Sequence, residues 1–165
     1  AEAKIRTVPE ISPDTKKSKN EIPESGALFA TLDDLKSCDG LMLGSPTRFG
    51  NMASPIKYFL ETATPLWVEG SLEDKPAAVF TSSASMHGGN ESTLLSMQLP
   101  LMHMGMILVG IPYSVSELSK TISGGTPYGS SHVRGKEEKG ISEDEKKICI
   151  AHGKRLAELC LKIKK

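Results

Sequence analysis

The sequence contains few cysteines and none of the paired spacings that bind structural metals. Its 165 residues include three cysteines, Cys38, Cys149 and Cys160, and four scattered histidines. No two cysteines form a Cys-x-x-Cys pair, so a structural zinc site, or any other metal site, has no support. We expect the cysteines to be reduced, mostly buried thiols of a cytoplasmic protein.

The sequence also lacks a net charge and any long hydrophobic run. Twenty Lys and Arg residues balance twenty Asp and Glu residues, so the chain has no general attraction for polyanions, which argues against nucleic acid as a partner. The apolar stretches are far shorter than the roughly 20 residues of a membrane span, and we expect no secretory segment and no membrane insertion. The length and a hydrophobic content of 38% are typical of one globular domain, which we expect to cover residues 1–165.

Three short runs of apolar residues predict buried β-strands. They cover Gly40–Ser45, Ala77–Thr81 and Met106–Ile111, and none of them alternates between apolar and polar residues. This pattern is typical of parallel strands that are covered on both faces. A further segment, Ala3–Val8, alternates well enough to predict a fourth strand. By contrast, the composition of residues 112–140 predicts an irregular connection.

Helices are predicted between these strands. Capping signals start four helices at Thr31, Ser54, Asn90 and Ser142, which end near Ser37, Pro65, Met104 and Lys164. Trp67 then lies in the loop beyond the second helix. Strands that alternate with helices predict an α/β fold built on a doubly wound parallel sheet.

Two loops that follow neighbouring strands form the candidate site. In doubly wound sheets, ligands bind beyond the carboxyl ends of the strands, and both Pro46–Met52 and Ser82–Gly89 begin there. The first loop offers short hydrogen-bonding groups, a fixed cation and a flat apolar ring, from Thr47, Asn51, Arg48 and Phe49. The second loop is rich in serine and glycine, so its backbone can approach a planar ligand closely. Together the loops suit a heterocycle with a hydrogen-bonding edge, although two ordinary strand-to-helix connections remain the alternative.

Five short motifs, taken in order along the chain, resemble one protein family. The motifs are GSPTRFGNM at 44–52, LW at 66–67, HGGNE at 87–91, MHMGM at 102–106 and GGTPYG at 124–129. They resemble those of the WrbA-type NAD(P)H:quinone oxidoreductases, and PTRFGNM is the most specific part of the likeness. The resemblance implies a flavodoxin-like fold, a sheet with strand order 2-1-3-4-5, and FMN as the cofactor.

The resemblance also implies which residues form the site. The isoalloxazine ring of FMN is expected to lie against the first loop, at Pro46, Thr47, Arg48, Phe49, Gly50 and Asn51. The second loop is expected to wrap the other side of the ring, at Ser82, Ser83, Ala84, Ser85, Met86, His87 and Gly88. His103 is implied beside the flavin as the catalytic residue, with the role of giving a proton or a hydrogen bond to the quinone. The residues implied to bind substrate are Trp67, Phe49 and Tyr113.

The implied reaction transfers two electrons together. NAD(P)H delivers a hydride to the flavin and leaves, and a quinone then takes both electrons to become a hydroquinone. Family members are typically tetramers whose active sites borrow residues from neighbouring subunits, so we expect a dimer or tetramer. Two other functions stay open: a one-electron carrier of the flavodoxin type, and a non-catalytic interaction module without flavin. Carriers of the first kind are usually strongly acidic, whereas this sequence is neutral.

Three features depart from the family pattern. Residue 1 stands at what resembles the second strand, so the first strand, the phosphate loop and the first helix have no counterpart. The second loop is one residue longer than usual and holds Met86 and His87 where glycine is common. Finally, Pro100 predicts a kink in the helix before His103.

Overall fold

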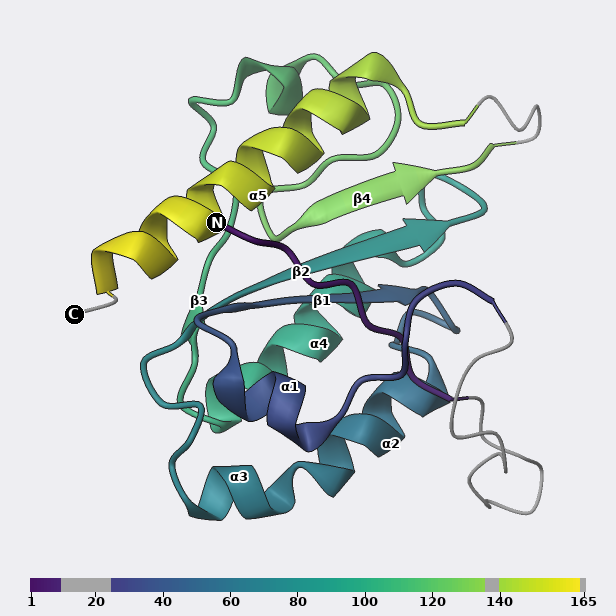
Figure 1. Ribbon diagram of the computed structural model, residues 1–165. Helices are drawn as coiled ribbons and strands as arrows, with labels where there is room; N and C mark the ends of the chain where they lie inside the picture. Colours follow the sequence, from purple (N-terminus) through teal and green to yellow (C-terminus); the bar gives the residue numbers. More distant parts are fainter. Residues whose placement is uncertain (10–24, 136–139, 164–165) are drawn as a thin grey trace.

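The described residues form a parallel β-sheet with helices on both faces (Figure 1). The computed structural model describes residues 1–9, 25–135 and 140–163. Its strands are Leu41–Pro46 (β1), Pro76–Ser83 (β2), Ile107–Leu108 (β3) and Ser130–Val133 (β4). Its helices are Leu32–Ser37 (α1), Ser54–Thr62 (α2), Thr64–Val68 (α3), Asn90–His103 (α4) and Glu143–Ile163 (α5), with a 3-10 turn at Ser116–Ser119 (η1). None of these described helices is long and apolar enough to cross a membrane.

β2 is the central strand of the sheet. β1 pairs with it in parallel along one edge, from Leu41 opposite Ala77 to Pro46 opposite Ser82. β3 and β4 share the other edge of β2, with β3 beside its first residues and β4 beside its last ones. The chain therefore leaves this edge after β3 and returns to it with β4. β1 and β2 thus correspond to strands 3 and 4 of the predicted order 2-1-3-4-5. β3 and β4 together take the place of strand 5, which is interrupted.

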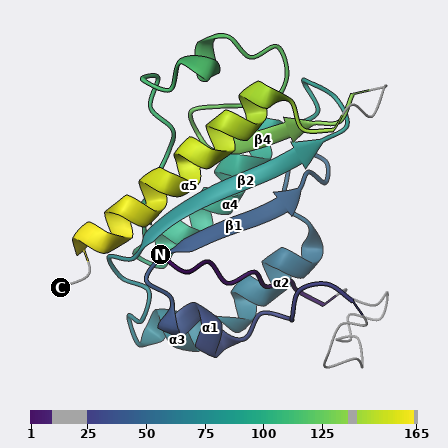
Figure 2. The ribbon, with the colours of Figure 1, turned by 45° about the horizontal axis from the view of Figure 1, so that its top comes forward.

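The two large helices cover opposite faces of the sheet (Figure 2). The core under α4 buries alternate residues of β1 and β2 against the helix, and includes Leu43, Val79, Leu94, Met97 and Leu101. The core under α5 is smaller and contains Ala78, Val109 and Leu156. Because neighbouring strand residues point to opposite faces, the apolar runs supply both cores, as the sequence pattern predicts.

The predicted strand at Ala3–Val8 is wrong. An isolated bridge between Thr7 and Phe29 forms there, and β1 has no second partner strand among the described residues. Alternation alone does not make a strand, because its backbone groups need a neighbouring strand to pair with. On the α5 side of the sheet, Met42 and Phe80 are 36% and 44% exposed, so this face is only partly covered near β1.

The last part of the sheet also differs from the prediction. The expected strand Met106–Ile111 is reduced to β3, because Ile111 N donates to Pro127 O at 2.9 Å and takes the chain away from β2. The expected irregular connection is wrong at β4, which is a true parallel strand. β4 contains two serines and a histidine and so has no hydrophobic signal. Its stability comes from polar partners far away in the sequence.

Two predicted helices begin with the capping boxes that their sequences indicate. Thr31 Oγ1 accepts a hydrogen bond from Asp34 N at 3.1 Å, and Asp34 Oδ2 accepts one from Thr31 N at 3.0 Å. In the same way, Ser142 and Glu145 exchange bonds of 3.2 and 2.8 Å at the start of α5. Each box satisfies two amides that the helix itself cannot. The predicted end of α5 at Lys164 lies outside the described residues.

The other helices differ in detail from the prediction. The N-caps of α2 and α4 are Ala53 and Gly89, each one residue before the predicted cap. Pro65 does not end the helical region but lies in the first turn of α3, where its missing N–H costs nothing. Trp67 therefore lies on a helix and not in a loop. α4 continues as an α-helix through Pro100 to its last residue.

The polar centre of the α5 face is His152, which is fully buried. Its Nε2 donates to Val109 O at 2.9 Å, and its Nδ1 accepts from Ser130 Oγ at 3.0 Å. Since a carbonyl oxygen can only accept, the ring carries a proton on Nε2. Burial lowers the pKa of His152 and so favours the neutral form. His152 thereby joins α5 to β4 and to the residue that follows β3.

The cysteines are less buried than predicted. Cys149 is exposed, Cys38 and Cys160 are half-buried, and none of the three is in a disulfide. Cys149 points outward because its neighbour Ile148 and the buried His152 define the inward face of α5. Burial raises the pKa of the Cys38 and Cys160 thiols, which makes both less reactive.

Candidate functional site

The structure brings the two predicted loops together at the carboxyl ends of β1 and β2. Pro46 at the end of β1 is paired with Ser82, and the next amide, Thr47 N, donates to Ser82 O at 2.9 Å. The backbones of the two loops also meet at Gly50 and Gly89. A side-chain carbon on Gly89 would lie only 2.8 Å from Gly50 Cα, which is too close. The two loops thus touch, and only glycine fits where their backbones meet.

The first loop contains a tight turn at Phe49 and Gly50. Arg48 N donates to Asn51 O at 2.8 Å, and Asn51 N donates to Arg48 O at 3.0 Å. Phe49 and Gly50 have φ angles of 54° and 76°, as in the type I′ turns of β-hairpins. Such turns favour Asn-Gly, so phenylalanine at the first position strains the backbone.

The side chain of Phe49 is wholly exposed. A large apolar ring that stays in water does not stabilise the fold, and a small residue that tolerates positive φ would strain this turn less. Strain of this kind is characteristic of residues that contact a ligand or partner. The turn therefore presents a flat apolar surface at the edge of the sheet where ligands bind.

Two buried hydroxyl groups hold the base of the first loop. Ser45 Oγ accepts a hydrogen bond from Ala53 N at 2.8 Å and donates to Pro46 O at 2.8 Å, so it joins the start of the loop to its end. Thr81 Oγ1 in turn donates to Ser45 O at 2.8 Å. Sequence reasoning missed both residues, although a serine and a threonine inside apolar strands are a visible signal.

The second loop is held by its own backbone and leads into the buried Asn90. Gly88 N and Ser83 Oγ both donate to Ser85 O, at 3.0 and 2.7 Å. Asn90, the first residue of α4, donates from Nδ2 to Met86 O at 3.3 Å. Its Oδ1 is buried and has no hydrogen-bond partner in the described part of the chain. A buried acceptor without a donor is costly, so this oxygen, in the residue that follows the second loop, would be stabilised by any donor that reached it.

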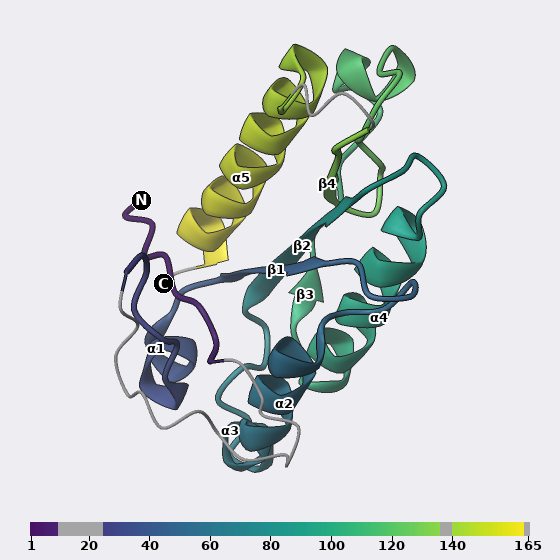
Figure 3. The same ribbon diagram turned by 90° about the vertical axis from the view of Figure 1, so that its right-hand side faces the viewer.

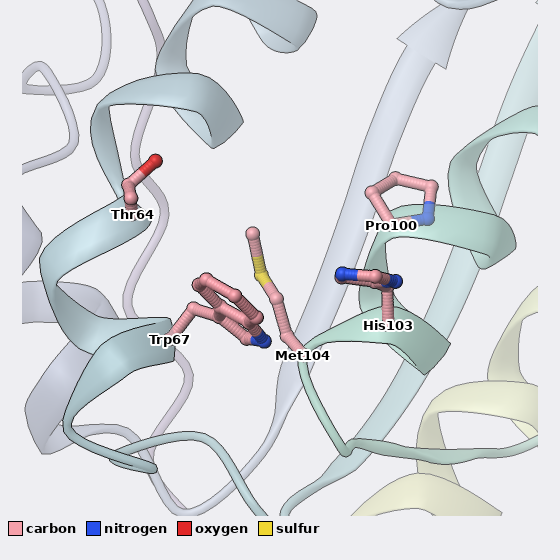
Figure 4. A pocket seen from close by; sticks show the side chains of 5 residues that line it. All are labelled: Thr64, Trp67, Pro100, His103 and Met104. Atoms are coloured by element: carbon pink, nitrogen blue, oxygen red, sulfur yellow. The ribbon is translucent and has the colours of Figure 1, made fainter.

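Trp67 and His103 face each other across a separate pocket (Figure 4). Their ring centroids are 5.6 Å apart and the planes are tilted by 30°. Thr64, Pro100 and Met104 complete the lining of this cavity, which has a volume of about 300 Å³. The pocket is an apolar slot with a single imidazole in its wall, and its size suits a small aromatic molecule.

The residues that line this pocket come from α3 and the last turn of α4, whereas the two loops lie near the first turn of α4 (Figure 3). α4 begins directly after the second loop and reaches His103 at the last of its 14 residues. A helix of that length is about 21 Å long, so within one chain His103 and Trp67 do not meet the loops. Tyr113, which is 65% exposed between β3 and η1, does not line the Trp67–His103 pocket either.

A second hollow borders the outer side of the first loop and was missed by sequence reasoning. Its volume is about 420 Å³, and it is lined by Asn51, Met52, Ser54, Lys57, Tyr58 and Glu61. Lys57 Nζ and Glu61 Oε1 form an ion pair of 2.6 Å on its wall. The charged side chains of Lys57 and Glu61 on α2 therefore lie beside the first loop.

A buried carboxylate fixes the end of β4, next to the start of the second loop. The Glu145 side chain is 1% exposed and accepts five hydrogen bonds, from Val133 N, Gly124 N, Ser123 Oγ, Ser142 N and His132 Nδ1. Burial alone would raise the pKa of Glu145, but the hydrogen bonds outweigh burial and lower that pKa to about 2. Because His132 is the register partner of Ser82, this ionised group also supports the edge of the candidate site.

Comparisons with known proteins place the chain in a family. The family model described as NADPH-dependent FMN reductase matches residues 3–119. The chain belongs to this family. An NAD(P)H dehydrogenase (quinone) of Geobacter sulfurreducens is 41% identical over 171 residues, which cover 99% of this chain and 84% of the relative. A protein of the same name from Acidithiobacillus ferrooxidans is 42% identical, with 96% of this chain and 82% of the relative covered.

A solved structure shows that this member of the FMN reductase family has the flavodoxin-like fold. The crystal structure of the flavodoxin, WrbA-like protein from Agrobacterium tumefaciens matches with a TM-score of 0.66 and covers 87% of this chain and 80% of that one. At 22% sequence identity, this likeness concerns the fold alone. The predicted flavodoxin-like α/β fold and the predicted family are thereby confirmed.

Proposed function

We propose that this member of the FMN reductase family reduces quinones to hydroquinones with two electrons from NAD(P)H, through FMN bound at the two loops. One observation carries the proposal: relatives that are 41% and 42% identical over nearly the whole chain are named NAD(P)H dehydrogenase (quinone). The paired loops at the carboxyl ends of β1 and β2 support it, because two loops that meet at this edge of the sheet suit a planar ring.

The residues of the two loops fit a flavin ring. FMN, when bound, accepts a hydride from NAD(P)H and passes two electrons to the quinone. For its apolar face the chain offers Phe49, and for its polar edge the unpartnered Oδ1 of Asn90. Arg48, whose Nη1 donates to Thr47 O at 3.1 Å, adds a permanent positive charge. Gly50 and Gly89 bring the backbones of the two loops together, so that one planar ring can lie against both loops.

We further propose that the protein acts as a dimer or tetramer in the cytoplasm. The Trp67–His103 pocket opens to solvent at the far end of α4, so a second copy has to bring it to the loops of the first. Exposed apolar side chains near that pocket favour such a contact: Val68, Leu99 and Met102 are 73%, 64% and 54% exposed. In the assembly, Trp67 would cover the quinone and His103 would give it a hydrogen bond. Three unpaired thiols fit a reducing compartment.

Phe49→Asn is expected to separate stability from binding. Asparagine tolerates positive φ and restores the Asn-Gly pair of a type I′ turn, so the free energy of unfolding should rise by about 1 kcal/mol. Loss of the aromatic surface should raise the Kd for FMN about tenfold. Urea unfolding and fluorescence titration with FMN measure the two effects. A variant that is neither more stable nor weaker in binding would show that the strained turn does not serve the flavin.

Trp67→Ala is expected to impair quinone binding and to leave flavin binding intact. Removal of the indole takes away the main apolar wall of the pocket, so the KM for a benzoquinone should rise about tenfold, with the Kd for FMN unchanged. Ile150→Ala is the control, because Ile150 is an exposed apolar residue of α5, on the other face of the sheet, and does not line the pocket. Equal KM values for the two variants would contradict the assigned role of the pocket.

The test of the proposal is anaerobic turnover of the full chain after incubation with FMN. NADH and NADPH are tried separately, with a benzoquinone as acceptor and no added reductase. The proposal predicts one hydroquinone formed for each NAD(P)H consumed. Oxidation of NAD(P)H that requires an added reductase would instead indicate a one-electron carrier. A protein that stays colourless after incubation with FMN and gel filtration would indicate the interaction module.

A further inference from the structure

A buried hydroxyl group on α4 forms a hydrogen bond to the first loop. Thr93 lies in the first turn of α4 and its side chain is fully buried. Its Oγ1 donates to Thr47 Oγ1 at 2.8 Å, and Thr47 Oγ1 donates in turn to Gly88 O at 3.4 Å. A single hydrogen-bond chain therefore runs from the helix through the first loop to the second.

This chain fixes the position of Thr47. A hydroxyl group has one donor and two acceptor positions. In Thr47 the donor is directed at Gly88 and one lone pair accepts from Thr93, while the backbone amide is held by Ser82 O at 2.9 Å. Thr47 is therefore held both at its side chain and at its backbone amide. Its side chain is in place before any ligand arrives.

The same helical turn supports a second contact between the loops. Gly89, the N-cap of α4, meets Gly50 backbone to backbone. Ser92 lies beside this contact, because a side-chain carbon on Gly50 would come within 2.9 Å of Ser92 Oγ. The first turn of α4 thus reaches the first loop at Thr47 and at Gly50, two points on either side of the strained Phe49.

We propose that Thr93 is a positioning residue that holds the two loops together as one pre-formed cradle for the flavin ring. The inference rests on the proposed function, because it assumes that the loops bind FMN. Thr93 touches Thr47 and acts through it. A cradle that is already ordered binds its ligand without the entropic cost of ordering two loops, so the Thr93 hydroxyl should contribute to flavin affinity from beneath the site.

Three variants test this role. Thr93→Val has nearly the same shape but no hydroxyl, Thr93→Ser keeps the hydroxyl, and Ser96→Ala is the matched control. Ser96 lies one turn further along α4, and its Oγ donates to Thr93 O at 2.8 Å, so its loss removes a hydrogen bond of similar length that reaches neither loop. We expect Thr93→Val to raise the Kd for FMN about fivefold, whereas Thr93→Ser and Ser96→Ala bind like the wild type.

Hydrogen–deuterium exchange without FMN supplies a measurement that does not depend on the flavin. In Thr93→Val, peptides that cover residues 46–52 and 82–89 should exchange faster than in the wild type, while α5 should be unchanged. If valine at position 93 prevents folding, Thr93→Ala removes the same hydroxyl without placing a methyl group against Thr47.

The outcomes separate this inference from the proposed function. A wild-type chain that does not bind FMN would contradict the proposed function, while the exchange rates would still decide whether Thr93 holds the loops. Wild-type exchange in the variant that lacks the hydroxyl would overturn the inference. So would a Thr93→Ser variant that binds FMN as weakly as Thr93→Val, because shape rather than the hydroxyl would then matter.

Discussion

Glu145→Gln is expected to lower the free energy of unfolding by about 3 kcal/mol. The Glu145 carboxylate is buried and accepts hydrogen bonds from five donors. Glutamine has the same shape, but its amide nitrogen would face the donors Ser142 N and His132 Nδ1. Two donor groups would then oppose the amide nitrogen in a site that is closed to solvent. When the Glu145→Gln variant unfolds, we expect the end of β4 and the start of α5 to separate before the rest of the fold.

Glu143→Gln is the control for this experiment. Glu143 lies in the same first turn of α5, but its side chain is 79% exposed, and its ion pair with Lys146 is 3.9 Å long. Its substitution should change the free energy of unfolding by less than about 0.5 kcal/mol. Urea unfolding of both variants and the wild type at pH 7 measures the difference. Equal stability of the two variants would show that the Glu145 network is not a major support of the fold.

The same carboxylate makes stability depend on pH. The pKa of Glu145 is about 2 in the folded protein, against an ordinary value of 4.5. A lowered pKa means that the unfolded chain binds the proton more readily, so this contribution is complete above about pH 5 and is lost as the pH falls towards 2. It amounts to about 3 kcal/mol. The Glu145→Gln variant should lack this part of the curve.

His152 should add an earlier step to that curve. Burial lowers the pKa of His152 below its ordinary value of 6.5, so the unfolded chain takes up a proton first as the pH falls below about 6.5. Stability should therefore begin to decline there in the wild type and in Glu145→Gln alike. A flat curve between pH 7 and 5 would contradict the buried neutral form of His152.

Gly89→Ala is expected to damage both the fold and the site. Gly89 has a φ of 95°, where an alanine is strained, and the new carbon would lie 2.8 Å from Gly50 Cα. Backbone atoms of the first loop would have to move. We expect the free energy of unfolding to fall by about 2 kcal/mol or more, and the Kd for FMN to rise at least about tenfold because the two loops separate.

Gly153→Ala makes the same chemical change with the opposite expected sign. Gly153 lies inside α5, and no atom is within 4 Å of the position of a new side-chain carbon. Alanine in a helix interior should raise the free energy of unfolding by about 0.5–1 kcal/mol. FMN binding should not change. A Gly89→Ala variant that matches Gly153→Ala in stability and binding would show that the loops do not depend on the glycine contact.

The sequence predicted the features whose signals are local. Capping boxes at Thr31 and Ser142 are read from residues three apart, and both form as expected. The adjacency of the two loops also follows from the pattern, since parallel strands end at the same edge of a sheet. By contrast, β4 was missed because its stability depends on Glu145 and His152, whose positions relative to β4 appear only in the folded chain.

The sequence predicted only part of the site, because contacts between residues that are distant in the sequence leave no local signal. The residues of the two loops lie together, but the supports Ser45, Asn90 and Thr93 are small polar residues whose partners are distant in the sequence. The resemblance placed His103 beside the flavin, whereas the length of α4 separates His103 from the loops of its own chain. Motifs name the residues that a resemblance implies for a site, but they do not give the distances between those residues in the folded chain.

The most direct test of the central claim is a titration of FMN with the full chain, followed by quenching of the flavin fluorescence. Riboflavin, which has the same ring without the phosphate, is titrated in parallel because the loops are proposed to hold the ring. We expect saturable quenching of both flavins, and we expect Phe49→Asn and Gly89→Ala to weaken it. Fluorescence that stays unchanged for both flavins with the wild-type chain would contradict a flavin site at these loops.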